Sequence, residues 1–360
     1  MAGDRRKGRI GGYAWAALLV GVVLAGCGSV IAVSDGTGSV LTGAGSTFDF
    51  PFLSRAFYDY DRQHHIEVNY QPIGSGGGVL QLMQGTVSFG ATDVPMSPTE
   101  KSLAEARGGP VIELPVTLGA DAISYNLPGL HTKLTFTPAI LAGIFLGRIT
   151  NWDDPMIRAV NRHARIPHLT IVVVHRADSS GTTYIFTDYL SRVSLAWRKQ
   201  VGTGEEVEWP VGVGAKGNTA VAQTIEATPG AIGYVGLAYV RTSHMAYGLV
   251  ENADHHFVIP DPATIMAAAQ TLSRLSQTDF SIVNARGAYS YPISGFSWVV
   301  LYAHQKHQWQ ASVLRQMLTW LITTEQRQAY TVGNAPLPLQ AQAYAVRQLA
   351  ALGDRDKPER

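Results

Sequence analysis

The chain has 360 residues, of which 46% are apolar and 15% charged, so it has enough apolar side chains to build a substantial core. Its length alone predicts about two domains. The formal net charge is +1, with acidic and basic residues scattered along the chain, which argues against a nucleic-acid-binding surface. We therefore expect no nucleic-acid partner.

The first 26 residues are organised like an export signal. A basic segment between Arg5 and Arg9 precedes an apolar run over 13–24, and Leu24-Ala25-Gly26-Cys27 follows. This start resembles bacterial lipoprotein signals, which implies that 1–26 are removed and that Cys27 is lipidated. An uncleaved membrane anchor is the alternative, but the run is short for a span of about 20 residues. Cys27 is the only cysteine, so its acylation would exclude an intrachain disulfide.

From residue 39 onward, strand-like and helix-like segments alternate, which predicts an α/β architecture. The first part has predicted strands at 39–42, 67–71 and 87–93, helices at 52–63 and 79–84, and a capping box at 97–100. The middle has predicted helices at 137–146, 183–190, 219–227 and 262–275, and strands at 169–174 and 231–235. The last helix carries on one face Trp309, Val313, Met317, Trp320 and Leu321.

Two long apolar stretches, 111–125 and 291–303, are predicted to be strands that cross between two lobes. After a tether at 27–38, lobe 1 would comprise 39–116 and 291–352, and lobe 2 would comprise 117–290. Two lobes joined in this way enclose a cleft, and open α/β sheets bind ligands at the carboxyl ends of their strands.

Three segments follow one plan, in which a strand leads through a loop of small residues into a helix: 43–48, 74–78 and 176–182. Helix N-termini offer unpaired N–H groups and partial positive charge, so such loops suit a compact anion. In the third loop Gly181 lets an anion approach the backbone, and Arg176 offers a planar fork for a tetrahedral oxyanion. The alternative is an ordinary turn capped by Ser180, with Arg176 and Asp178 as a surface ion pair.

Signals for other kinds of site are weak. The segment 212–219 superficially resembles a nucleotide-binding P-loop, but Lys216 precedes Gly217, the reverse of the required order. The adjacent pairs His64-His65 and His255-His256 lack a third ligand at metal spacing, so we predict no metal and no cofactor. There is no G-x-S-x-G nucleophile motif. Asp93, at the tip of a predicted strand, could be a catalytic carboxylate, an acceptor in an anion site or a turn former.

Several segments together resemble one family. In chain order they cover 41–48, 73–79, 89–93, 145–154, 176–182, 201–204 and 229–235. They resemble bacterial phosphate-binding proteins, the substrate-binding components of Pst phosphate ABC importers. The resemblance runs from about residue 40 to the C-terminal helices. It implies a two-lobed periplasmic-binding-protein fold of type II that delivers inorganic phosphate to an ABC permease. It also implies an exported, monomeric, non-enzymatic protein that is lipid-anchored at the outer face of the cytoplasmic membrane or in the periplasm.

The resemblance implies phosphate binding by Thr47, Phe48, Ser75, Asp93, Arg176, Ser180, Gly181 and Thr182. Asp93 would accept a hydrogen bond from a protonated phosphate oxygen, and Asp178 would orient Arg176. The chain departs from the family form at Ser46, Asp49 and Gly76. The rival functions are a secreted phosphatase or phosphotransferase that uses the same loops, and a binder of another oxyanion such as sulfate.

Overall fold

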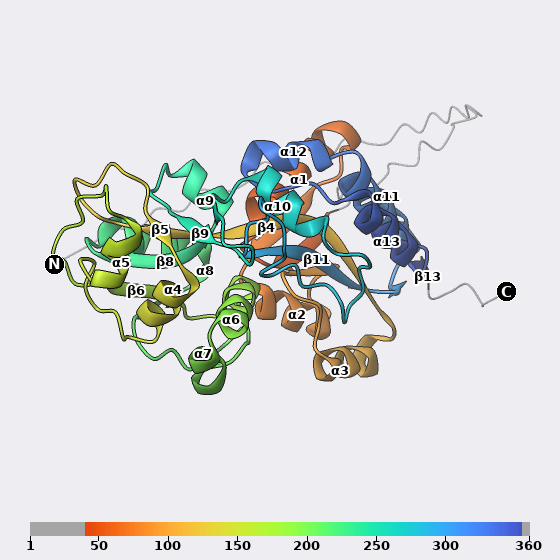
Figure 1. Cartoon of the computed structure of the whole chain (residues 1–360). Helices are drawn as coiled ribbons and strands as arrows, with labels where there is room; N and C mark the ends of the chain where they lie inside the picture. Colours follow the sequence, from red (N-terminus) through yellow and green to blue (C-terminus); the bar gives the residue numbers. More distant parts are fainter. Residues whose placement is uncertain (1–39, 355–360) are drawn as a thin grey trace, which may run out of the picture. The chain divides into compact units, whose positions relative to one another are not determined.

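A computed structural model describes residues 40–354, in which helices and strands alternate as an α/β fold (Figure 1). Within this range eight strands form one sheet, in the order β2-β1-β3-β11-β4-β8-β6-β7. Their bounds are β1 Leu41–Gly45, β2 Val68–Pro72, β3 Phe89–Thr92, β4 Val111–Tyr125, β6 Val172–Arg176, β7 Val213–Ala215, β8 Ala231–Gly236 and β11 Ser294–Tyr302. The short strands β5 Thr135–Phe136, β9 Leu249–Glu251 and β10 Phe257–Val258 form a smaller sheet, and β12 His304–Gln305 pairs with β13 Gly353–Asp354.

Helices connect and cover these strands (Figure 1). In the first part of the described range they are α1 Phe50–His64, α2 Ser75–Gln84, α3 Pro98–Gly108, α4 Pro138–Phe145, α5 Pro155–Val160, α6 Gly181–Val193 and α7 Leu195–Gln200. The later ones are α8 Gly217–Ala227, α9 Leu237–Thr242, α10 Pro262–Ala269, α11 Gln308–Thr323, α12 Gln326–Val332 and α13 Leu339–Leu349. The predicted capping box at Ser97 and Glu100 is confirmed, because both reciprocal hydrogen bonds are formed.

The two long apolar stretches form strands, as predicted, and these strands, β4 and β11, lie side by side in the middle of the sheet. β4 pairs antiparallel with β11 from Val111 to Ala120, and then with β8 from Asp121 to Tyr125. All 15 of its residues are buried, which explains its near-continuous apolar sequence. The ladder with β11 shifts register between Ser297 and Trp298, where the partner changes from Thr117 to Pro115. A local irregularity of this kind accommodates a proline within a sheet.

The strand directions place the carboxyl ends of the two halves of the sheet opposite each other. β1 and β3 run parallel to each other and antiparallel to β11, and therefore in the direction of β4. β6 runs parallel to β8, which is antiparallel to β4. The carboxyl ends of β1 and β3 therefore face the carboxyl end of β6 across the middle of β4. The loops that follow these strands are brought to one place.

Some element boundaries differ from the prediction. α2 begins at Ser75 rather than Val79, so the glycines after it are helical. A Cβ on Gly78 would lie 2.5 Å from the carbonyl oxygen of Ala44, so glycine lets this helix pack directly on β1. β6 extends to Arg176, which therefore ends a strand instead of belonging to the loop.

Two helix predictions were partly wrong. α10 ends at Ala269 instead of Leu275. Trp309 is 43% exposed, although it was predicted on the buried face of α11. The face that packs on the core is carried by Ala311, Leu314, Met317, Leu318, Leu321 and Ile322.

Candidate functional site

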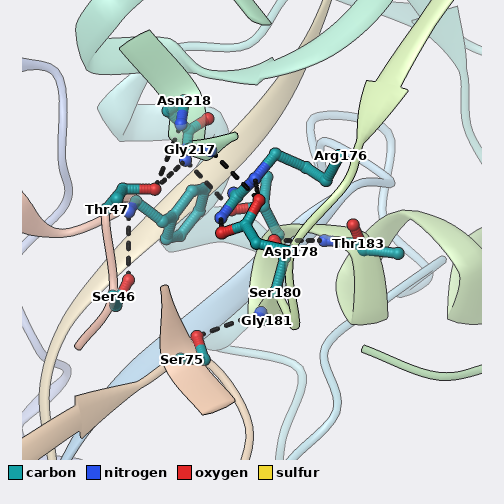
Figure 2. A network of polar contacts seen from close by, with 12 residues as sticks. Ser46, Thr47, Ser75, Arg176, Asp178, Ser180, Gly181, Thr183, Gly217 and Asn218 are labelled. Atoms are coloured by element: carbon teal, nitrogen blue, oxygen red, sulfur yellow. Dashed lines mark hydrogen bonds and ion pairs between the residues drawn. The ribbon is translucent and has the colours of Figure 1, made fainter. Parts of the chain in front are cut away.

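The loops 74–78 and 176–182 come from opposite halves of the sheet and touch each other (Figure 2). The backbone N–H of Gly181 donates a 3.0 Å hydrogen bond to Ser75 Oγ. The N–H of Gly76 donates to the carbonyl of Ser179 at 3.4 Å. A Cβ on Gly76 would overlap the Ser179 side chain, so glycine at this position permits the close contact.

Asp93 follows β3 and faces these loops as a buried carboxylate. Its Oδ1 accepts hydrogen bonds from Ser46 Oγ and Ser297 Oγ, both at 2.7 Å, and its Oδ2 accepts from Ser75 Oγ at 3.3 Å. Burial raises the pKa of Asp93 to about 6, although these hydrogen bonds and the charge of Arg176 oppose the rise. Asp93 is therefore ionised near neutral pH and acts as a hydrogen-bond acceptor.

Arg176 and Asp178 form a bidentate ion pair in which Arg176 is buried and Asp178 is partly exposed, rather than a surface pair. Arg176 Nε donates to Asp178 Oδ1 at 2.7 Å, and Nη2 donates to Oδ2 at 2.5 Å. The backbone N–H of Gly217 adds a 3.0 Å hydrogen bond to Asp178 Oδ1. Arg176 Nη1 donates to Thr182 Oγ1 at 3.1 Å. Since a guanidinium has five N–H donors, about two of them have no protein partner among residues 40–354 and are available to an anion.

The hydroxyl of Thr47 accepts two hydrogen bonds from the other half of the sheet (Figure 2). Asn218 donates to Thr47 Oγ1 from its backbone N–H at 3.2 Å and from Nδ2 at 2.9 Å. The N–H of Gly236 donates to Asn218 Oδ1 at 2.8 Å, which fixes the orientation of the Asn218 amide. A hydroxyl has two acceptor lone pairs and one donor hydrogen. Because both lone pairs of Thr47 are engaged, its hydroxyl is left as a donor.

The hydroxyl of Thr182, which belongs to the other half of the fold, also accepts two hydrogen bonds. Its Oγ1 accepts from Arg176 Nη1 and from Asn218 Nδ2, both at 3.1 Å. The hydroxyl hydrogen of Thr182 is therefore left to donate to another group. Two buried hydroxyls, one from each half of the sheet, are thus set as donors beside Arg176. This arrangement suits an anion.

Two other predicted site residues have partners within the protein. Ser180 is the N-cap of α6, and its Oγ accepts from the N–H of Thr183 at 3.1 Å, as the alternative interpretation of this loop expected. The N–H of Phe48 donates to Ser46 Oγ at 3.0 Å. The structure thus brings all eight predicted residues into one region. Within it, the N–H groups of Phe48 and Gly181 and the hydroxyls of Ser75 and Ser180 contact protein atoms.

Sequence reasoning missed Asn218, Ser46 and Ser297 as parts of the network. The sequence could have indicated Asn218. Strand β7 leads through Lys216 and Gly217 into helix α8, so this segment has the same order of strand, glycine and helix as the other three loops. Ser46 lies inside a predicted loop but was noted only as a departure from the family. Nothing in the sequence marks Ser297, which reaches Asp93 through the pairing of β11 with β3.

The arrangement combines one ionised acceptor, Asp93, with donors from Thr47, Thr182 and Arg176. A tetrahedral oxyanion that keeps a proton satisfies both kinds of group, since its proton meets the carboxylate and its other oxygens accept. Over residues 40–354, no group of three or more His, Cys, Asp or Glu side chains could hold a metal ion.

Comparison with known proteins places this chain among binding proteins. Residues 32–325 match the family model described as a PBP superfamily domain. The chain is 36% identical over 301 residues to the phosphate-binding protein PstS of Xylella fastidiosa strain 9a5c, covering 83% of this chain and 81% of that protein. It is 31% identical over 309 residues to the phosphate-binding protein PstS of Methanocaldococcus jannaschii, covering 80% and 79%.

Solved structures share the fold. A high-affinity periplasmic phosphate-binding protein, PfluDING, solved with phosphate at pH 8.5, superposes with a TM-score of 0.68 at 21% identity, covering 85% of this chain and 92% of that one. A phosphate-binding protein from Stenotrophomonas maltophilia gives a TM-score of 0.66 at 18% identity, covering 86% and 94%. The predicted two-lobed periplasmic-binding-protein fold is confirmed.

Proposed function

Because this chain belongs to the PstS family of phosphate-binding proteins, we propose that it binds inorganic phosphate outside the cytoplasmic membrane and delivers it to an ABC transporter permease. The observation that carries the proposal is the pair of hydroxyls, Thr47 and Thr182, whose lone pairs are occupied by protein donors. Both are left as donors beside Arg176, and Asp93 supplies the acceptor that a protonated phosphate needs.

We assign the phosphate contacts to the residues named from the family resemblance: Thr47, Phe48, Ser75, Asp93, Arg176, Ser180, Gly181 and Thr182. Asp178 orients Arg176 through their bidentate pair. In the structure the N–H of Phe48 donates to Ser46, and the N–H of Gly181 donates to Ser75. On binding, both N–H groups would donate to phosphate oxygens instead. Such an exchange costs little, because a hydrogen bond to a charged group is stronger than one to a neutral hydroxyl.

The mechanism in this proposal is closure of two lobes around the anion. Lobe 1 comprises 39–116 and 291–352, and lobe 2 comprises 117–290. Asp93 and Thr47 belong to the first, and Arg176 and Thr182 to the second. An anion held by all four stabilises the closed arrangement, which the permease then recognises. Small-angle scattering should therefore show a smaller radius of gyration with phosphate than after the protein has been stripped of phosphate.

The cellular location rests on the N-terminal sequence. We propose that residues 1–26 are a lipoprotein signal and that Cys27 is the lipidated N-terminus; both lie outside the residues that the structure describes. Between residues 40 and 354, no helix is both long and apolar enough to span a bilayer.

Native mass spectrometry of protein purified without added phosphate tests the proposal directly. We expect a co-purified anion with the mass of phosphate and renewed binding of phosphate by the stripped protein. A protein that binds no phosphate in either state would contradict the proposal. A chromogenic phosphomonoester distinguishes the rival function, because a phosphatase or phosphotransferase would release the chromophore and a binding protein would not.

A further inference from the structure

Asp49 is a second buried carboxylate next to the proposed phosphate contacts, and the family resemblance gives it no role. It follows Thr47 and Phe48 and stands at the N-cap position of α1, but its side chain makes no capping hydrogen bond. The residue is fully buried. Neither of its carboxylate oxygens has a hydrogen-bond partner within residues 40–354. An ionised carboxylate in such a position is costly, since burial removes its hydration without replacing it.

The charged and titratable groups around Asp49 do not offset that cost. Asp49 interacts electrostatically with Asp93 beyond β3, Tyr70 on β2 and Tyr239 on α9. None of these groups is a cation. Burial and the charge of Asp93 raise the pKa of Asp49 well above its usual value. The nearby hydroxyl of Ser46 and the residue's own N–H lower it less, and neither forms a hydrogen bond to the carboxylate.

Ser46 links Asp49 to the site. Its Oγ donates to Asp93 Oδ1 at 2.7 Å and accepts a long hydrogen bond from the N–H of Asp49 at 3.5 Å. One hydroxyl thus connects the backbone of Asp49 to the carboxylate of Asp93. Arg176, the cation whose charge acts on Asp93, is already paired with Asp178. Charges on Asp49, Asp93 and a bound anion would together exceed what one paired arginine can balance.

We propose that Asp49 must remain a neutral acid for phosphate to bind, because a further negative charge beside Asp93 would oppose the bound anion. This inference rests on the proposed phosphate-binding function. Ionisation of Asp49 and binding of the anion then exclude each other. By linkage, phosphate affinity should fall by about tenfold per pH unit once the pH exceeds the pKa of Asp49 in the free protein.

The test is isothermal titration of the full-length protein with phosphate across a series of pH values, comparing wild type with Asp49→Asn, which is neutral at every pH. Ionisation of phosphate itself affects both proteins equally, so the ratio of their dissociation constants reports the ionisation of Asp49 together with its electrostatic effect on Asp93. We expect that ratio to be close to one at low pH and to reach about tenfold or more in favour of Asp49→Asn at high pH. Asp49→Ser is a second variant, because serine is favoured at an N-cap and should leave the helix intact.

Glu113→Gln is the matched control. Glu113 is also a fully buried acid with a raised pKa, but its partners are Lys101 and the N–H of Met96 rather than Asp93. This variant should follow the wild-type pH profile. If wild type, Asp49→Asn and Asp49→Ser all bind phosphate with the same pH profile, the inference is wrong while the proposed function stands. If none of them binds phosphate at any pH, the proposed function itself is wrong.

Discussion

The side-chain amide of Asn218 donates a 2.9 Å hydrogen bond to the hydroxyl of Thr47, across the two halves of the sheet. Asn218 lies in the first turn of α8, which follows β7, whereas Thr47 lies in the loop after β1. The same amide nitrogen also reaches Thr182 at 3.1 Å. One residue thus sets the hydrogen-bonding direction of two proposed phosphate ligands and joins the halves that must close on the anion.

Replacement of Asn218 by alanine should weaken phosphate binding by about tenfold. Each lost hydrogen bond contributes about 0.5–1.5 kcal/mol, and about 1.4 kcal/mol corresponds to a tenfold change in affinity. Isothermal titration of Asn218→Ala with phosphate measures the effect. Asn126→Ala is the control, because Asn126 donates its amide to the carbonyl of Glu226, at 2.8 Å, outside this network. If Asn218→Ala binds phosphate within about twofold of the wild-type affinity, the hydrogen bonds of Asn218 to Thr47 and Thr182 do not contribute to phosphate binding.

Replacement of Arg176 by lysine should reduce phosphate affinity by about tenfold to a hundredfold, because each charge-assisted hydrogen bond contributes about 1.5–3 kcal/mol. The positive charge is kept, but an ammonium cannot pair with both oxygens of Asp178 and still present a planar pair of donors. Arg192→Lys is the control, since Arg192 makes a 2.9 Å pair with Asp188 at a partly exposed position of α6. Equal affinities of Arg176→Lys and wild type would indicate that Arg176 only supplies charge.

Much of the fold and part of the site could be predicted because their signals are local. Hydrophobic periodicity predicted most strands and helices. The three loops could be recognised because each follows a strand, consists of small residues and precedes a helix. The helical glycines after Ser75 could not be predicted, since glycine disfavours helices and long-range contacts explain them, such as the close approach of Gly78 to Ala44 and of Gly76 to Ser179. The contact of Ser297 with Asp93 depends on the register of β11 against β3, which is a long-range property of the sheet.

Acidification should narrow the preference for phosphate over sulfate. The pKa of Asp93 is raised from 3.8 to about 6, so below about pH 6 it is a neutral acid, and above that value it is an acceptor. A neutral carboxyl can donate to sulfate, which has no proton of its own to offer. Competition binding at several pH values measures the ratio of the two affinities. A ratio that stays constant through this range would show that the ionisation of Asp93 does not control selectivity.

Replacement of Cys27 by alanine should release the protein from the membrane fraction or leave it unprocessed. A single acyl chain binds membranes only marginally, so stable attachment would depend on the several chains of a lipoprotein. Cell fractionation and electrophoretic mobility report the outcome, with Ser29→Ala as a neighbouring control. Identical fractionation and migration of Cys27→Ala and wild type would contradict lipidation.

Isothermal titration of wild type and Asp93→Asn with both phosphate and sulfate tests the central claim most directly. With sulfate bound, the Asp93 carboxylate would face a like charge. The repulsion energy is about 4 kcal/mol at a separation near 4 Å and an effective dielectric of about 20. Since about 1.4 kcal/mol is tenfold in affinity, we predict that wild type prefers phosphate by on the order of a thousandfold. Asp93→Asn should narrow this gap, because the amide can donate to sulfate and still accept from phosphate. Sulfate binding by wild type within about tenfold of phosphate, or an unchanged ratio in Asp93→Asn, would contradict the account of the site.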